Sequence, residues 1–187
     1  MNGAAVQRGL AAMAGALGGM PEEAGIPLKY APVIHDARGE GAGDLPLAIE
    51  LVYEGYLIHY RESRVACAGS PKERRLLAGD YFYAHGLRLV ARAGDAEAVG
   101  LLTRLMAACS YLRAEGADWR LDEGLWELTA AAVAAAAGTL PRAAATRIFD
   151  RVDGAIAAGR PGDLRPLLAA GKALVSGGVT AEGGDPT

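Results

Sequence analysis

The polar residues that could do chemistry gather in two short segments of this 187-residue chain. The second segment runs from Gly79 to His85 and places Asp80 among aromatic residues inside an otherwise apolar helix. The first segment lies at the end of a long apolar stretch and holds Glu54, His59, Tyr60, Arg61, Glu62 and Arg64. A magnesium-dependent site needs carboxylates that converge at spacings of three or four along a helix, and most acids in this chain stand singly.

Each segment has a structural interpretation. For the first, we expect a solvated helix end with ion pairs at spacings of three and four residues. For the second, two alternatives stay open. Either Asp80 pairs with a neighbouring Tyr, His or backbone group in the core, or the aromatic face contacts another chain.

The histidines and cysteines predict neither a metal site nor a nucleophile. The three histidines show no HxxxH or HExxH spacing. Cys67 and Cys109 lie far apart, match no metal spacing and have no histidine at a spacing that suggests a pair. We expect two buried thiols in a reducing compartment, and therefore a cytoplasmic protein.

Composition excludes several other classes. Hydrophobic types make up 51% of the chain and charged types 22%, a balance typical of one globular domain. The net charge is −3 and no basic run occurs, so we expect no nucleic-acid partner. No stretch approaches the roughly 18 apolar residues that a membrane span needs, so we expect no transmembrane segment.

The pattern of apolar residues predicts an all-α protein. Alanine is abundant, whereas the β-branched residues that favour strands are sparse. Asp44 with Pro46, and Asp122, are typical helix starts, and Gly94, Gly116 and Gly159 are typical ends. Residues 18–44 read as a loop or a broken helix. We predict one helical domain over 1–175, a disordered Gly-rich tail over 176–187, and helices near 6–17, 44–64, 71–94, 95–116, 122–138, 141–159 and 163–175.

Three segments, in this order and spacing, resemble one family. Residues 76–84, LLAGDYFYA, resemble the helix of trans-polyprenyl diphosphate synthases that reads roughly L-x-G-D-Y-L-x-A. Residues 47–59 are similar to the family helix that leads into L-I-H-D-D, and residues 101–116 occupy the place of the next helix. The likeness covers roughly residues 44–116. It implies a truncated helical bundle of isoprenoid-synthase type.

The chain departs from this family where the catalytic residues would stand. Active members carry D-D-x-x-D directly after L-I-H to hold magnesium, but here residues 60–64 read YRESR. Glu62 between two arginines would not attract the cation. The basic stretch that binds isopentenyl diphosphate is reduced to Lys29, and residues 109–115 replace the glutamine-bearing segment. The second aspartate-rich motif has no counterpart, so no catalytic residue is carried over.

This chain is short and lacks these motifs, and in both respects it resembles the small subunit of heteromeric hexaprenyl or heptaprenyl diphosphate synthases. The resemblance implies a regulatory subunit that has no turnover of its own and influences product chain length in a heterodimer. It also implies that magnesium and both diphosphate sites belong to the full-length catalytic subunit, and that the product serves quinones such as menaquinone. We expect the partner interface at Tyr56, His59, Tyr60, Asp80, Tyr81 and Tyr83.

Two other functions stay open. The chain could be a helical interaction protein, such as a homodimer, with no role in isoprenoid synthesis. It could also be an active small prenyltransferase with an unconventional site around Glu54, Glu62 and Asp80.

Overall fold

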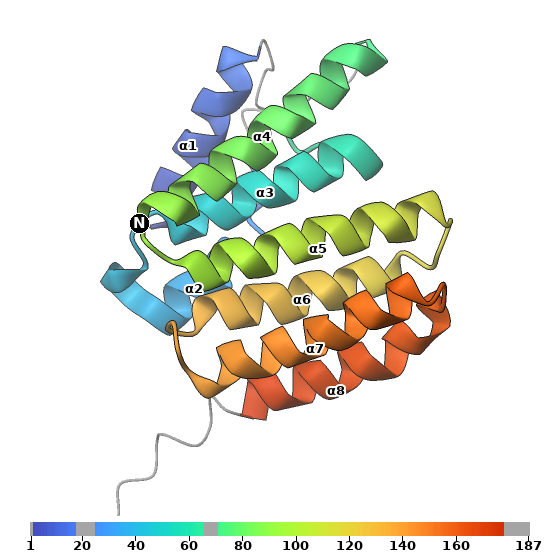
Figure 1. The fold of residues 1–187 in the computed structure, drawn as a ribbon. Helices are drawn as coiled ribbons and strands as arrows, with labels where there is room; N and C mark the ends of the chain where they lie inside the picture. The colour runs from blue at the N-terminus through green and yellow to red at the C-terminus, as the bar shows by residue number, and fades with distance from the viewer. Residues whose placement is uncertain (1, 18–24, 66–70, 178–187) are drawn as a thin grey trace, which may run out of the picture. The chain divides into compact units, whose positions relative to one another are not determined.

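The structure is a computed structural model, and it describes residues 2–17, 25–65 and 71–177. In these ranges the chain is all-α, as predicted, with eight α-helices, two short 3-10 helices and no strand (Figure 1). It divides into two compact units, residues 1–96 and 97–187. The first unit contains α1 (Gly3–Ala16), α2 (Ala31–Arg38), η1 (Gly39–Ala42), α3 (Leu45–Tyr60) and α4 (Lys72–Arg92). The second contains α5 (Ala96–Ala114), α6 (Arg120–Ala134), α7 (Leu140–Ala157), η2 (Pro161–Asp163) and α8 (Leu164–Gly177).

Helix α3 is the buried helix of the first unit. Its residues from Leu45 to Ile58 are apolar on nearly every side, and it packs against α1, α2 and α4. A helix that is apolar all round belongs in a core. It ends at Tyr60, four residues before the predicted end, because Arg61 is extended and the chain then turns back toward α3.

Glycines let α3 and α4 approach closely. A Cβ placed on Gly86 of α4 would lie 2.7 Å from the carbonyl oxygen of Ala48, and one on Gly55 of α3 would lie 2.9 Å from the carbonyl oxygen of Gly79. Both contacts are with backbone, which cannot swing aside as a side chain can. The two helices therefore cross at a separation that only glycine permits.

The segment between the first helix and α3 contains a helix of its own. Pro32 lies in the first turn of α2, and Gly39 and Gly43, both with positive φ, bound the 3-10 turn that follows. For residues 31–42, the broken-helix alternative is therefore correct. Residues 18–24 lie outside the described ranges.

The second unit follows the predicted helices, with two corrected boundaries. Gly116 and Gly159 follow the ends of α5 and α7 with positive φ, as expected, and Gly94 does the same after α4 in the first unit. Helix α6 starts at Arg120 rather than at Asp122, because the buried Asp122 side chain pairs with Arg113 of α5 at 2.9 Å. It ends at Ala134, where the buried Arg142 donates from Nε to the carbonyl of Ala135 and from Nη2 to that of Val133.

The last helix extends slightly beyond its predicted end. Helix α8 ends at Gly177, so the predicted tail begins within it, and residues 178–187 lie outside the described ranges. Among the described helices, none has the length and apolar character needed to cross a membrane.

Candidate interaction surface and the ion cluster beside it

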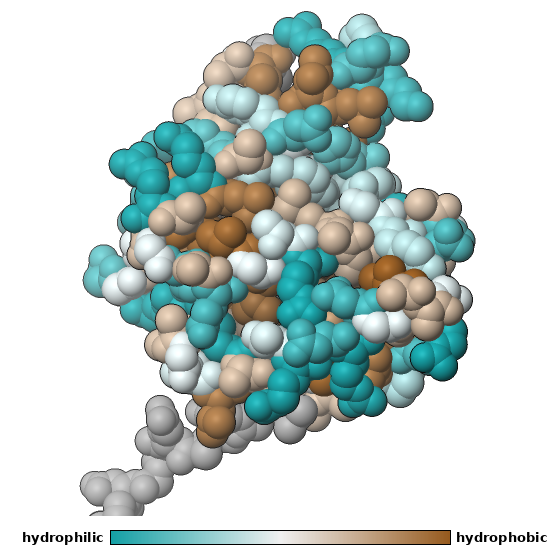
Figure 2. Space-filling view, viewed as in Figure 1, coloured by the Kyte–Doolittle hydropathy of each residue, from teal (hydrophilic) through white to brown (hydrophobic). Residues whose placement is uncertain are grey.

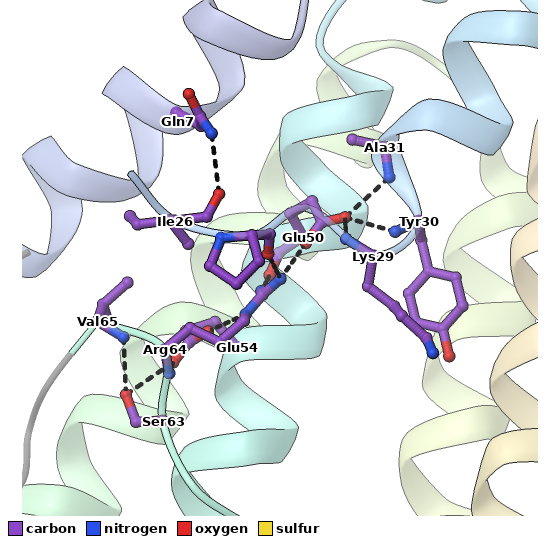
Figure 3. Close-up of polar contacts among 11 residues, drawn as sticks. Gln7, Ile26, Lys29, Tyr30, Ala31, Glu50, Glu54, Ser63, Arg64 and Val65 are labelled. Carbon is purple, nitrogen blue, oxygen red and sulfur yellow. Dashed lines mark hydrogen bonds and ion pairs between the residues drawn. The ribbon is translucent and has the colours of Figure 1, made fainter. Parts of the chain in front are cut away.

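Two fully buried carboxylates lie one turn apart on α3. Glu50 Oε1 accepts three backbone N–H bonds, from Lys29 at 2.7 Å, Tyr30 at 2.5 Å and Ala31 at 2.8 Å (Figure 3). These amides lead into α2, whose first residue is Ala31, and the unpaired N–H groups and dipole at a helix start favour an anion. Glu50 therefore attaches the chain at the start of α2 to α3.

Arg64 holds the second oxygen of each carboxylate. Its Nη1 lies 2.5 Å from Glu50 Oε2 and its Nε lies 2.7 Å from Glu54 Oε2. Glu54 Oε1 accepts the Ser63 hydroxyl at 2.7 Å and the Arg64 backbone N–H at 2.9 Å. Arg64 Nη1 also donates to the carbonyl of Pro27 at 2.8 Å. We call Glu50, Glu54 and Arg64 the ion cluster.

Arg64 keeps its positive charge in the ion cluster. Burial alone would lower the pKa of Arg64, but attraction by Glu50 and Glu54 outweighs burial and raises it. All four carboxylate oxygens already accept hydrogen bonds, and such charge-assisted bonds are the strong ones. The cluster is thus suited to holding three chain segments together: residues 27–31, α3, and residues 63–64.

The ion cluster corrects the interpretation of the first polar segment. Glu54 is fully buried and Arg64 is nearly so, whereas only Arg61 and Glu62 are exposed as a solvated helix end would be. Sequence reasoning missed the role of Glu50. The available signal was the four-residue spacing of Glu50 and Glu54, which puts both acids on one side of a helix that is otherwise apolar. In the described parts of the chain, no three His, Cys, Asp or Glu side chains converge as a metal site would require.

The second polar segment joins α4 to the end of α3. His59 Nε2 lies 3.2 Å from Asp80 Oδ1, and the His59 ring stacks on Tyr83 with centroids 5.3 Å apart. The contact needs Gly79, because a Cβ there would lie 2.5 Å from His59 Nε2. Asp80 thus has a histidine partner, as one alternative predicted, but its side chain is 69% exposed rather than in the core.

Aromatic rings continue along α3 from this histidine. Tyr60 lies 5.6 Å from Tyr56, Tyr56 lies 6.1 Å from Tyr53, and Tyr53 meets Tyr30 edge-on at 5.0 Å, all between ring centroids. The spacing of Tyr53, Tyr56 and Tyr60 places them on one side of the helix. The rings therefore form one continuous row, with Arg64 over the Tyr53 ring at 4.9 Å.

The first half of α4 exposes large apolar side chains. Leu77 is 70% exposed, Leu76 43% and Tyr81 40%, and Asp80 lies between them in the helix. Figure 2 shows hydrophobic and hydrophilic side chains next to one another over the first turns of α4, near the top of the view. We call Leu76, Leu77 and Tyr81 the α4 strip. Leu77 and Tyr81 are four residues apart and so lie on one side of the helix.

The structure places the six predicted interface residues unequally. Asp80 and Tyr81 are exposed, His59, Tyr60 and Tyr83 are half-buried, and Tyr56 is buried. His59, Asp80 and Tyr83 contact one another, and Tyr60 contacts both His59 and Tyr56. The interface itself stays a prediction. Leu76 and Leu77 are exposed beside it and were not among the predicted residues.

Comparisons with known proteins returned no relative. No protein-family model matches the chain, and neither a curated protein nor a solved structure matches it. The resemblance to polyprenyl diphosphate synthases therefore rests on residues 44–116 alone.

Proposed function

We propose that this chain is a non-catalytic helical subunit that binds a larger protein through the first half of α4. The observation that carries the proposal is the exposure of all three residues of the α4 strip, which reaches 70% at Leu77. Contiguous exposed apolar side chains are costly in water and commonly mark interaction sites. Tyrosine is also among the residues enriched at protein interfaces.

Charged side chains flank the α4 strip. Asp80, between Leu77 and Tyr81, is largely exposed, and Glu73 lies one turn before Leu77 on the same side of the helix. A protein groove can present a cation or a hydrogen-bond donor to each carboxylate, and acceptors to Lys72, Arg74 and Arg75, which are exposed in the first turn of α4. We therefore expect α4 to bind in an apolar groove with a polar rim.

The resemblance suggests which protein the partner is. We propose a full-length polyprenyl diphosphate synthase, which would supply magnesium and both diphosphate sites, while this chain influences the length of the prenyl product. In a bacterium such a heterodimer would serve menaquinone biosynthesis. The ion cluster supports a role without catalysis, because the oxygens of Glu50 and Glu54 are held by Arg64 and by backbone donors.

A binding experiment tests the surface. The full chain would be mixed with the full-length synthase from the same genome, and the dissociation constant measured by titration calorimetry. Leu77→Asp should weaken binding at least about tenfold, the loss typical of a central interface residue. Leu140→Asp is the matched control, because Leu140 is 80% exposed at the start of α7. Equal effects of the two variants would contradict the assignment to α4.

A turnover experiment tests the function. Allylic and isopentenyl diphosphates would be supplied with magnesium, and the prenyl products analysed by chain length with and without this chain. Identical activity and product length in the two reactions would show the proposal to be wrong. Diphosphate release by the isolated chain would instead favour the active-enzyme alternative, and a stable homodimer that ignores the synthase would favour the interaction protein.

A further inference from the structure

The second unit contains a hollow that the proposed function does not use. It has a volume of about 580 Å³, within the range of small-molecule sites, and it lies where α7, η2 and α8 meet. The residues around it are Arg151, Gly154, Ala155, Arg160, Asp163, Pro166, Leu167 and Ala170.

The hollow follows from small residues on facing helices. Gly154 and Ala155 on α7, and Ala170 on α8, have little or no side chain to fill the space between the two helices. A Cβ added to Gly154 would meet no atom within 4 Å. Pro166 and Leu167 add an apolar wall from α8, so the hollow can hold a compact apolar group.

Two arginines make the hollow attractive to an anion. Among the described residues, Arg151 makes no hydrogen bond or ion pair. Arg160 Nε lies 3.4 Å from Asp163 Oδ2, but both side chains are more than half exposed, so their pairing is weak. With two cations and one anion, the lining has a net charge of +1. Guanidinium groups bind carboxylate and phosphate oxygens in a fork geometry.

We propose that this hollow binds a small organic anion. Its phosphate or carboxylate group lies against Arg151 and Arg160, and its compact apolar part lies over Gly154 and against Pro166 and Leu167. The proposal does not depend on the partner or the activity proposed above, because it rests only on residues of the second unit.

The test uses the full chain, labelled with ¹⁵N and titrated with phenyl phosphate, benzoate and phenol. Saturable chemical-shift changes at residues 151–170 are expected with phenyl phosphate or benzoate at millimolar concentration, and phenol should bind at least about tenfold more weakly because it lacks the charge that pairs with arginine. Phenyl phosphate and benzoate distinguish a phosphate site from a carboxylate site. The proposal is overturned if neither anion shifts these residues, or if phenol binds as well as the anions.

Paired variants separate the site from general effects. Arg151→Gln should weaken binding about tenfold through the loss of a charge-assisted hydrogen bond. Arg147→Gln, an exposed arginine one turn earlier on α7, should leave binding unchanged. Gly154→Leu should fill the hollow and abolish binding while the helix persists, since leucine favours helix over glycine. Gly100→Leu, at another open glycine within a helix, is its control. Equal losses within either pair would refute the site.

Discussion

Replacing Arg64 by leucine should destabilise the protein strongly. The variant loses the 2.7 Å contact with Glu54 and the 2.5 Å contact with Glu50, and leaves two buried carboxylates one turn apart without a counter-charge. Removing one partner of a buried ion pair costs about 3–5 kcal/mol. Glu50 keeps its three backbone donors, and Glu54 keeps the Ser63 hydroxyl, so we expect about 3–4 kcal/mol. That is a large share of a typical stability of about 5–15 kcal/mol.

Urea unfolding at pH 7, followed by far-UV circular dichroism, measures this loss. Adding Glu54→Gln to the variant should recover part of the loss at pH 7, because it removes one buried charge.

Arg92→Leu provides the control, because Arg92 is exposed at the end of α4 and its loss should change the free energy of unfolding by less than about 0.5 kcal/mol. The reasoning fails if Arg64→Leu lowers the free energy of unfolding by less than about 1 kcal/mol at pH 7, because a loss that small is typical of a surface ion pair. It also fails if adding Glu54→Gln to the variant recovers none of the loss.

Three further outcomes follow from the packing and the titrating groups. Gly86→Ala should lower the free energy of unfolding by about 1–3 kcal/mol, whereas Gly100→Ala, at an open helical position, should raise it by about 0.5–1 kcal/mol; denaturant curves distinguish the two. Burial raises the pKa of the Cys109 thiol, so with the other cysteine replaced by serine a disulfide reagent should react with Cys109 only after unfolding. Burial, aided by Arg88, lowers the pKa of His85 from 6.5. The contribution of His85 to the free energy of unfolding is therefore fully present above pH 6.5 and is lost as the pH falls further. NMR titration of the His85 ring in Arg88→Gln should show a partial rise of that pKa.

The helices and their ends were largely predictable, because they depend on residues near one another in the chain. Gly94, Gly116 and Gly159 take positive φ after their helices, where glycine has no steric penalty. The predicted helix start at Asp122 was wrong because it also relied on local residue type alone. As a residue type it favours a helix start, but a partner on α5 buries it inside the helix.

Chemistry at the candidate sites depended on contacts between distant segments. Asp80 lies 21 positions from His59, and Arg64 reaches the carbonyl of Pro27 across 37 positions. Local spacing says nothing of such pairs. The spacing of apolar residues along α4 did not show which of its leucines would stay exposed, because that depends on which other helices cover each side of α4.

The sequence by itself determined that the chain is all-α, where most helices stop, and that residues 60–64 lack the aspartates of an active synthase. Those properties depend on residue types and on the backbone preferences of short segments, which can be read without knowing which distant residues are in contact. Only the tertiary structure decided that Glu50, Glu54 and Arg64 form one buried cluster, and that Leu76, Leu77 and Tyr81 remain exposed. Burial and charge pairing arise when separate segments pack together and exclude water, so the same glutamate can be a surface residue in one fold and a buried attachment point in another.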